Sequence, residues 1–246
     1  MILLASDTST SQGSVAMRGQ DGKVLREDLD PIHPHSQTLL PAVEKLLARA
    51  GHVRGDIQAI AVGTGPGAFT GLRVGLATFK AWAGASGIPL IPVVSMDAVA
   101  LPLLRKGVSA VVLLDARKGE VYAAYYPVLD TSNLPRRDGE VMLVSLDSVP
   151  DWISSLNDPR AHLVGTGLHL LAEKGFLGGF ENLGDGSEAP DASWILALAE
   201  TLLPLGHTVE PSNLVPCYVR PPDAKRPSPG TIVTKTVETG DRTDGF

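Results

Sequence analysis

Apolar and polar positions near the start of the chain alternate in short runs that predict strands. Residues 2–6, 13–18 and 23–29 form three such runs, and each is bounded by polar residues. The Asp21-Gly22 pair between the last two runs is a strong short-range signal for a hairpin turn. The chain therefore begins with strands joined by tight turns.

Helical spacing replaces this pattern after the third strand. Apolar residues recur at every third or fourth position over 39–50, and Gly51 follows as a stop signal. Pro41 predicts either a helix start near it or a kink, because an interior proline costs about 3 kcal/mol. Strands and helices then alternate, which is typical of an α/β sheet with helices on its faces. The predicted elements are strand 57–62, helix 70–86, strand 88–94 and helix 95–105.

The pattern of the first strands restarts at residue 108. Strand 108–115 ends in Asp115, as the first strand ends in Asp7, and in both places a short polar turn leads to a second strand. This weak internal repeat predicts two related lobes. Further predicted elements are helix 146–156, strand 162–165 and helix 192–203. The predicted divisions are a first lobe at 1–105, a second lobe at 106–220 and a loosely held, dispensable tail at 221–246.

Composition places the chain among ordinary globular proteins. Of its 246 residues, 43% are hydrophobic and 20% are charged. The formal net charge of −6 argues against a surface that coats nucleic acid. Cys217 is the single cysteine, which excludes an intrachain disulfide and a thiolate metal cluster. Because no apolar run reaches a membrane-spanning length and no basic residues precede the first run, we expect a cytoplasmic protein without a membrane partner.

The turn after the first strand is a candidate phosphate site. Asp7 is followed by Thr8, Ser9 and Thr10, so the turn offers hydroxyls and backbone amides to a phosphate, and Asp7 is placed to hold a metal-bound water. Turns rich in Ser, Thr and Asp also arise because these side chains satisfy local backbone groups. The residues alone leave both interpretations open.

The corresponding turn of the second repeat departs from a phosphate site. Asp115 is in place, but Arg117 and Lys118 occupy a turn that would need small residues for close backbone approach. A hairpin turn with solvated charges is favoured there. Histidines are scattered apart from His33 and His35, whose spacing fits no zinc pattern, so we predict no metal site.

A glycine cluster, AVGTGPGAFTGLRVG, lies between a predicted strand and a predicted helix. Gly63, Gly65, Pro66 and Gly67 can be forced onto a dinucleotide fingerprint, but Pro66 lacks an amide donor and no acidic residue lies about 20 positions on. We therefore predict a tight turn. The helix that follows carries small residues at 71, 75 and 78 and alanines at 77, 81 and 85, which indicates close helix packing, either within the fold or at a subunit interface.

The chain resembles the bacterial TsaB (YeaZ) family. The resemblance is carried by ILLASDTST, HSQTLLPAVEKLL, AIAVGTGPGAFTGLRVGLATFKAWA, GIPLIPVVSMDAVA and LLDARKGEVYAAYY, in order from residue 1 to about 127. The run G-P-G-x-F-T-G-x-R-x-G is highly specific, and beyond residue 127 only scattered features such as PCYVR look similar. The resemblance implies an α/β fold of the actin/Hsp70/sugar-kinase-like (ribonuclease H-like) type with two related lobes.

The resemblance also implies a function. TsaB proteins support the TsaD subunit, which together with the ATPase TsaE transfers a threonylcarbamoyl group to the adenosine beside the anticodon of tRNA. TsaD binds its metal through an H-x-x-x-H helix, which this sequence lacks. The chain is therefore expected to be a non-catalytic activating subunit that needs no cofactor, binds ATP weakly if at all, and reaches TsaE and tRNA only through the complex. Peptidase activity is disfavoured.

Two alternatives remain at this point. One is an active ATP-dependent phosphotransferase of the same fold, with Asp7 to Thr10 on phosphate and Asp115 on metal. The other is a scaffold for an unrelated enzyme.

The resemblance favours the interface interpretation of the small residues. In the family, the helices corresponding to 35–50 and 70–86 form a bundle with the same elements of a partner or, when the protein is alone, of a second copy. Gly75→Leu is expected to weaken that association while the monomer stays folded. The expected interface residues are Leu39, Val43, Leu46, Gly71, Leu72, Gly75, Thr78, Phe79 and Trp82.

Overall fold

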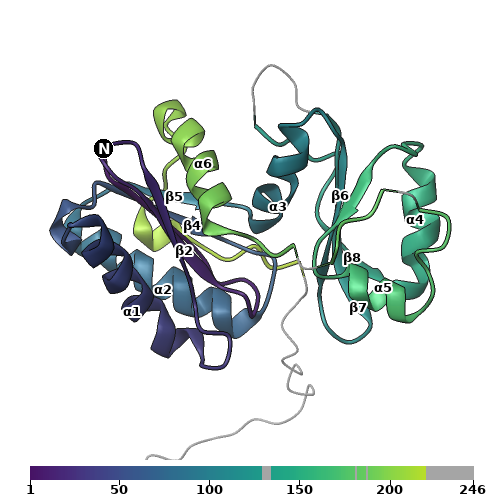
Figure 1. The fold of residues 1–246 in the computed structure, drawn as a ribbon, viewed down its shortest axis with the longest axis horizontal. Coiled ribbons are helices and arrows are strands. Elements are labelled where there is room, and N and C mark those ends of the chain that lie inside the picture. The colour runs from purple at the N-terminus through teal and green to yellow at the C-terminus, as the bar shows by residue number, and fades with distance from the viewer. Residues whose placement is uncertain (129–133, 181, 187, 220–246) are drawn as a thin grey trace, which may run out of the picture.

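The computed structural model describes residues 1–128, 134–180, 182–186 and 188–219, which form two α/β lobes side by side (Figure 1). The expectation for the tail 221–246 lies outside the described residues. No helix within the described ranges combines the length and the apolar character needed to cross a membrane.

The first lobe is built on a five-stranded sheet with the order β3-β2-β1-β4-β5. Strands β1 to β3 form an antiparallel meander, whereas β4 and β5 run parallel to β1. The strands are β1 (Leu3–Asp7), β2 (Ser14–Arg18), β3 (Val24–Asp28), β4 (Ala59–Gly63) and β5 (Leu90–Val93). The three opening strands and the α/β alternation are thus confirmed.

Helices cover both faces of this sheet. Helices α1 (His35–Ala50) and α2 (Phe69–Ser86) pack on one face against Ile2 and Leu4, while Leu3 and Ala5 point to the other face and contact α6 (Ala192–Leu202). Burial on both faces explains why residues 2–5 are continuously apolar. Helix α1 runs unbroken through Pro41, which lies on its exposed side.

The second lobe repeats the arrangement of the first. Its sheet has the order β8-β7-β6-β9, with β6 antiparallel to β7 and parallel to β9, as β1 is antiparallel to β2 and parallel to β4. The predicted repeat is therefore confirmed by topology. The elements are β6 (Ala110–Asp115), β7 (Glu120–Tyr126), β8 (Met142–Ser145), β9 (His162–Val164), α4 (Val149–Ser155) and α5 (Leu168–Glu173).

Helix α3 (Ser95–Leu104) connects the two hydrophobic cores. Met96 and Val99 belong to the core of the second lobe, whereas Ala98 and Leu101 belong to a core of the first lobe. A helix that is apolar on two sides in this way packs against both cores. It fixes the lobes to each other.

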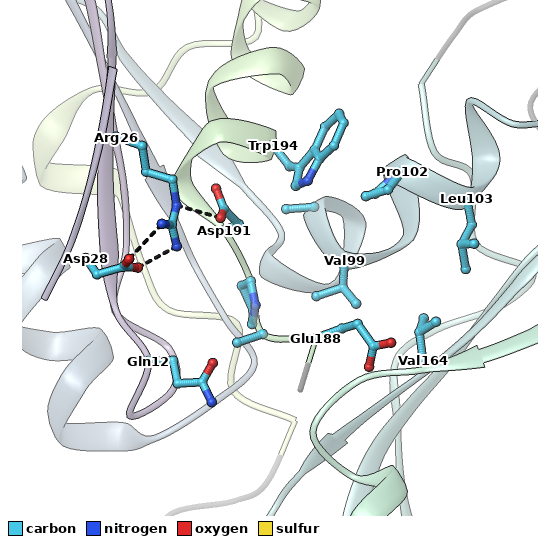
Figure 2. A pocket seen from close by; sticks show the side chains of 13 residues that line it. Gln12, Arg26, Asp28, Val99, Pro102, Leu103, Val164, Glu188, Asp191 and Trp194 are labelled. Atoms are coloured by element: carbon cyan, nitrogen blue, oxygen red, sulfur yellow. Dashed lines mark hydrogen bonds and ion pairs between the residues drawn. The ribbon is translucent and has the colours of Figure 1, made fainter. Parts of the chain in front are cut away.

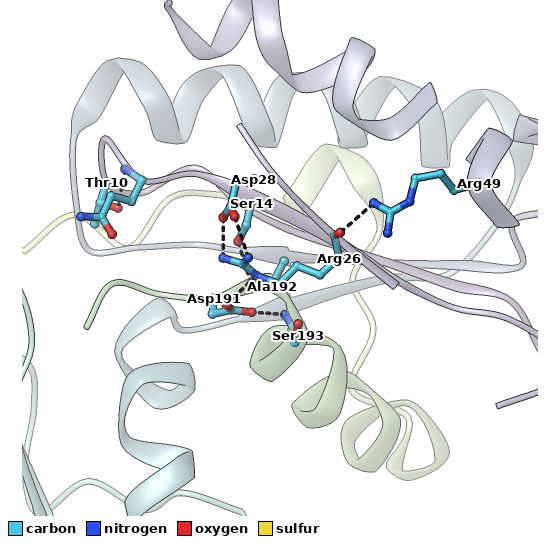
Figure 3. A network of polar contacts seen from close by, with 9 residues as sticks. Thr10, Ser14, Arg26, Asp28, Arg49, Asp191, Ala192 and Ser193 are labelled. Atoms are coloured by element: carbon cyan, nitrogen blue, oxygen red, sulfur yellow. Dashed lines mark hydrogen bonds and ion pairs between the residues drawn. The ribbon is translucent and has the colours of Figure 1, made fainter. Parts of the chain in front are cut away.

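After residue 188 the chain returns to the first lobe, where α6 packs on the first sheet. The expected C-terminal boundary of the second lobe, in the range 106–220, is therefore wrong. Asp191 caps α6 and pairs with Arg26 of β3, whose guanidinium also binds Asp28 (Figure 3). The amide of Ala192 donates to Ser14 Oγ at 2.9 Å. The segment 207–219 then contacts α2, because Lys80 donates to the carbonyl oxygens of Ser212 and Leu214 and Gly84 lies next to Pro211. These contacts join segments that are far apart in the sequence, so no local sequence pattern predicts them.

Candidate functional site

The Asp7 carboxyl at the end of β1 points into the protein. Its Oδ1 accepts hydrogen bonds from the amide and hydroxyl of Ser9 at 2.8 and 2.6 Å, and its Oδ2 accepts one from Ser95 Oγ at 2.6 Å. Ser95 Oγ in turn accepts the amide of Gly65 at 2.9 Å. Asp7 therefore holds together its own turn, the glycine loop and the start of α3.

Burial sets the protonation of this carboxyl. Asp7 is fully buried, and the loss of hydration raises its pKa above the ordinary value, although the hydrogen bonds from Ser9 and Ser95 act in the opposite direction. Ser9 and Thr8 are also buried, and neither they nor Asp7 lines a described pocket. Of the candidate phosphate-site residues of the first lobe, Asp7 to Thr10, only Thr10 reaches an open surface.

Thr8 occupies the space that the glycines of α2 leave open. Thr8 Oγ1 donates to the carbonyl oxygen of Gly71 at 2.9 Å. A Cβ on Gly71 would overlap the Thr8 carbonyl oxygen, and one on Gly75 would overlap Thr8 Oγ1. These two glycines therefore permit close packing of α2 on the first hairpin of the same chain, and their expected place at a subunit interface is wrong.

The glycine loop closes over the same hairpin. A Cβ on Gly63 would overlap the Asp7 carboxylate, and one on Gly67 would overlap the backbone of Ser9. The amide of Ala68 donates to the Ser9 carbonyl oxygen at 2.6 Å. Gly65 adopts a φ of 93°, which favours glycine. The predicted tight turn is confirmed, and the backbone that it approaches is the Asp7 turn.

The second hairpin brings a cation towards the first. Asp115 Oδ1 accepts the amide of Arg117 at 2.7 Å, and Arg117 and Lys118 have positive φ values of 64° and 56°. Arg117 lines a pocket of about 320 Å³ together with Thr10 and His35. The structure thus places Thr10 near Arg117 of the opposite lobe and keeps Asp7 away from this surface.

A larger cavity of about 380 Å³ lies between the lobes (Figure 2). One wall is charged and carries Arg26, Asp28 and Asp191, and Glu188 lies apart from them beside Val164. The facing wall is apolar and consists of Val99, Pro102, Leu103, Val164 and Trp194. Cavities of this size and mixed polarity are typical of small-molecule sites. Glu188 and the 188–191 segment carried no recognisable motif, so the sequence alone did not point to them.

Comparison with known proteins identifies the family. The family model described as TsaD, tRNA N6-adenosine threonylcarbamoyltransferase, matches residues 31–138. The Escherichia coli "tRNA threonylcarbamoyladenosine biosynthesis protein TsaB" is 33% identical over 234 residues, which cover 94% of this chain and 99% of that protein. The chain belongs to the TsaB family. The resemblance inferred from the first half therefore extends over nearly the whole chain.

Other members of the TsaB family agree in sequence and fold. The Haemophilus influenzae protein of the same description is 30% identical and covers 89% of this chain and 94% of that protein. The solved structure "YeaZ from Pseudomonas aeruginosa" superposes with a TM-score of 0.76 at 30% identity and covers 88% of this chain and 99% of that one. The predicted two-lobed fold is confirmed, and the family takes part in tRNA threonylcarbamoyladenosine biosynthesis.

Most of the hydrophobic residues expected at a TsaB interface lie instead in the core of the first lobe. Leu39, Val43, Leu46, Leu72 and Phe79 are each no more than 1% exposed. They are buried because they hold α1 and α2 on the sheet, so they offer no surface to a partner. Thr78 and Trp82 remain partly exposed.

The exposed side of α2 carries a different row of small residues. Ala77, Ala81 and Ala85 follow one another at four-residue spacing and are all exposed. Leu40 of α1 is 39% exposed. Arg54 connects the two helices, because it pairs with Glu44 of α1 and its guanidinium lies 5.9 Å from the Trp82 ring centroid. We call Leu40, Ala77, Ala81 and Ala85 the outer helix face.

Within the described ranges, no group of three or more His, Cys, Asp or Glu side chains is placed to hold a metal ion. His33 binds Asp30, and His35 binds the carbonyl oxygen of Thr10 at 2.7 Å. Burial raises the pKa of the Cys217 thiol, so the thiol form is favoured at neutral pH. Both histidines therefore serve local contacts.

Proposed function

We propose that this chain is the non-catalytic subunit that binds a TsaD-type transferase and activates it in forming threonylcarbamoyladenosine next to the anticodon of tRNA. Its direct partner is the TsaD-like subunit, and the TsaE-like ATPase and tRNA are reached through the complex. In the absence of that partner the chain forms a homodimer. It works in the cytoplasm and requires no cofactor of its own.

The arrangement around Asp7 is the observation that carries this proposal. A phosphotransferase of this fold needs the strand-end carboxylate and the hydroxyls of the following turn at the open cleft. Here Asp7, Thr8 and Ser9 are buried and their side chains bond one another, Ser95 or Gly71. Because these side chains are already bonded within the protein, they disfavour the alternative of an ATP-dependent phosphotransferase. A non-catalytic role in support of a TsaD-type transferase is then favoured.

The outer helix face supports the choice of partner surface. The exposed alanines of α2 let a second helix approach closely, and the exposed Leu40 adds apolar area on α1. Helices α1 and α2 cover the face of the first sheet opposite α6, whereas Asp191 and Trp194, which line the interlobe cavity, lie on the α6 side (Figure 1). A partner seated there leaves the interlobe cavity uncovered.

The direct test is threonylcarbamoyl transfer to tRNA by purified TsaD-like and TsaE-like proteins, with and without this chain. The proposal expects transfer to require the chain, while the chain alone neither binds nor hydrolyses ATP. Equal transfer without the chain would refute the activating role.

A matched pair of variants tests the surface. Ala81→Arg adds bulk to the outer helix face, where overpacking costs about 1–3 kcal/mol, so affinity for the TsaD-like subunit is expected to fall roughly tenfold or more. Ala172→Arg makes the same change at an exposed position on α5 of the second lobe and is expected to have no effect. Equal affinities for both variants by isothermal titration calorimetry would exclude the outer helix face.

A further inference from the structure

Glu188 places its carboxylate on three backbone amides. Oε2 accepts hydrogen bonds from Gly165 at 3.2 Å and from Gly186 at 3.1 Å, and Oε1 accepts one from Asp185 at 3.0 Å. The amides come from two segments, the turn directly after β9 and the loop 184–186, which follows α5. Convergent amides of this kind form an anion-binding concavity. We call the amides of Gly165, Asp185 and Gly186 the amide cradle.

Glycines around the amide cradle keep it open to an anion. Gly165 and Gly186 have φ values of 111° and 81°, which other residues rarely adopt. A Cβ on Gly184 would overlap the Glu188 carboxylate, so the absence of a side chain at Gly184 leaves the space that the carboxylate fills. The loop is thus shaped around a bound negative charge.

The amide cradle adjoins the interlobe cavity. Val164, which precedes Gly165, lines the cavity together with Glu188, and Trp194 lies across it (Figure 2). The next residue, Thr166, accepts the amide of Asp115 at 3.2 Å, so the cradle also neighbours the second hairpin. A ligand held in the cradle has room for an organic group against the apolar wall.

Charge keeps other anions out while Glu188 is present. Arg26 is the cation of the cavity wall and already pairs with Asp28 and Asp191. Glu188 adds a third carboxylate and accepts the hydrogen bonds of all three cradle amides. A second anion would therefore meet occupied donors and like charge.

We propose that the amide cradle is a latent phosphoryl-binding site that Glu188 occupies as an internal anion. The ligand class is a phosphate monoester or nucleotide whose organic part lies in the interlobe cavity. This site is distinct from the outer helix face, so its failure would leave the proposed activating role untouched. In the wild-type chain the cradle is closed to phosphate.

Glu188→Ala in the full chain tests the proposal. Orthophosphate, adenosine, AMP and ATP are titrated separately into the wild-type and variant proteins by calorimetry, with circular dichroism to confirm folding. The three freed amides are expected to make AMP, ATP and orthophosphate bind about tenfold tighter or more than to wild type. Adenosine, which lacks the phosphoryl group, is expected to show no gain. A folded variant with unchanged phosphate affinity, or equal gains for adenosine and AMP, would overturn the proposal.

Two further variants complete the test. Gly184→Ala in the Glu188→Ala background puts a methyl group where the carboxylate lay, and it is expected to abolish the gained binding. Retained binding in that double variant would overturn the cradle as the site. If Glu188→Ala does not fold, Glu188→Ser replaces the carboxylate with a short polar side chain that leaves the cradle amides free. Phosphate binding by Glu188→Ser that is tighter than that of wild type then supports the proposal, and equal binding by the folded variant refutes it.

Discussion

The substitution Gly75→Ala distinguishes two roles for Gly75, close packing inside the first lobe and close packing against a partner subunit. The added Cβ would lie well inside the 3.0 Å that real Cβ atoms keep from Thr8 Oγ1. Thr8 is 1% exposed and its hydroxyl is bound to Gly71, so it has no free space to move into. Gly84 on the same helix is exposed, and its Cβ would meet Pro211 at an ordinary 3.8 Å.

The expected magnitudes have opposite signs at these two positions. Alanine is favoured over glycine in a helix by about 1 kcal/mol, so Gly84→Ala should stabilise the protein by up to that amount. At Gly75 the same gain is outweighed by about 1–3 kcal/mol of overpacking and by about 1 kcal/mol for a displaced Thr8 hydrogen bond. Gly75→Ala should therefore destabilise the protein by about 2 kcal/mol.

Urea unfolding followed by circular dichroism measures these differences. Several protein concentrations are needed, because self-association would add a concentration-dependent term. Thr8→Ala removes the overlapped hydroxyl, so in that background Gly75→Ala is expected to cost little or to stabilise, with a coupling free energy of about 2 kcal/mol. Equal stability of Gly75→Ala and Gly84→Ala, together with weaker partner binding by Gly75→Ala, would refute the packing assignment and restore the interface one.

Three other perturbations test the buried polar groups. Burial raises the pKa of Asp7, so its contribution to stability is complete below the ordinary carboxyl pKa and is lost as the pH rises through the raised pKa. Asp7→Asn should therefore make the free energy of unfolding in urea depend less on pH. Parallel stability-against-pH curves for wild type and Asp7→Asn would contradict this. Arg137→Met breaks the 2.9 Å bond to Asp97 and should cost about 2 kcal/mol in urea unfolding, partly restored by adding Asp97→Asn. Lys80→Met removes the 2.9 Å bond to the Leu214 carbonyl oxygen and should speed proteolysis within 207–219, whereas an unchanged cleavage rate would show that the bond does not anchor this segment.

Local patterns predicted most elements of the first lobe within a few residues. The periodicity over 39–50 and the stop at Gly51 correspond to α1, which ends at Ala50, and the apolar runs correspond to β1, β2 and β3. Repeated strand and turn order also predicted the second lobe. These features are local because hydrogen bonding within a helix and the two-residue period of a strand leave their mark on neighbouring positions.

The sequence by itself determined the elements, the repeat, the tight turn of the glycine cluster and the family resemblance. Only the tertiary structure decided which surfaces these elements present. Gly75 and Ala81 lie on one helix and are both small, yet one faces Thr8, far away in sequence, and the other faces outwards. The hydrogen bonds from Ser95 to Asp7 and from the Gly165 amide to Glu188 likewise join segments that are distant in sequence. Burial depends on which segments meet in the assembled fold, so residue type and spacing along the chain do not specify it.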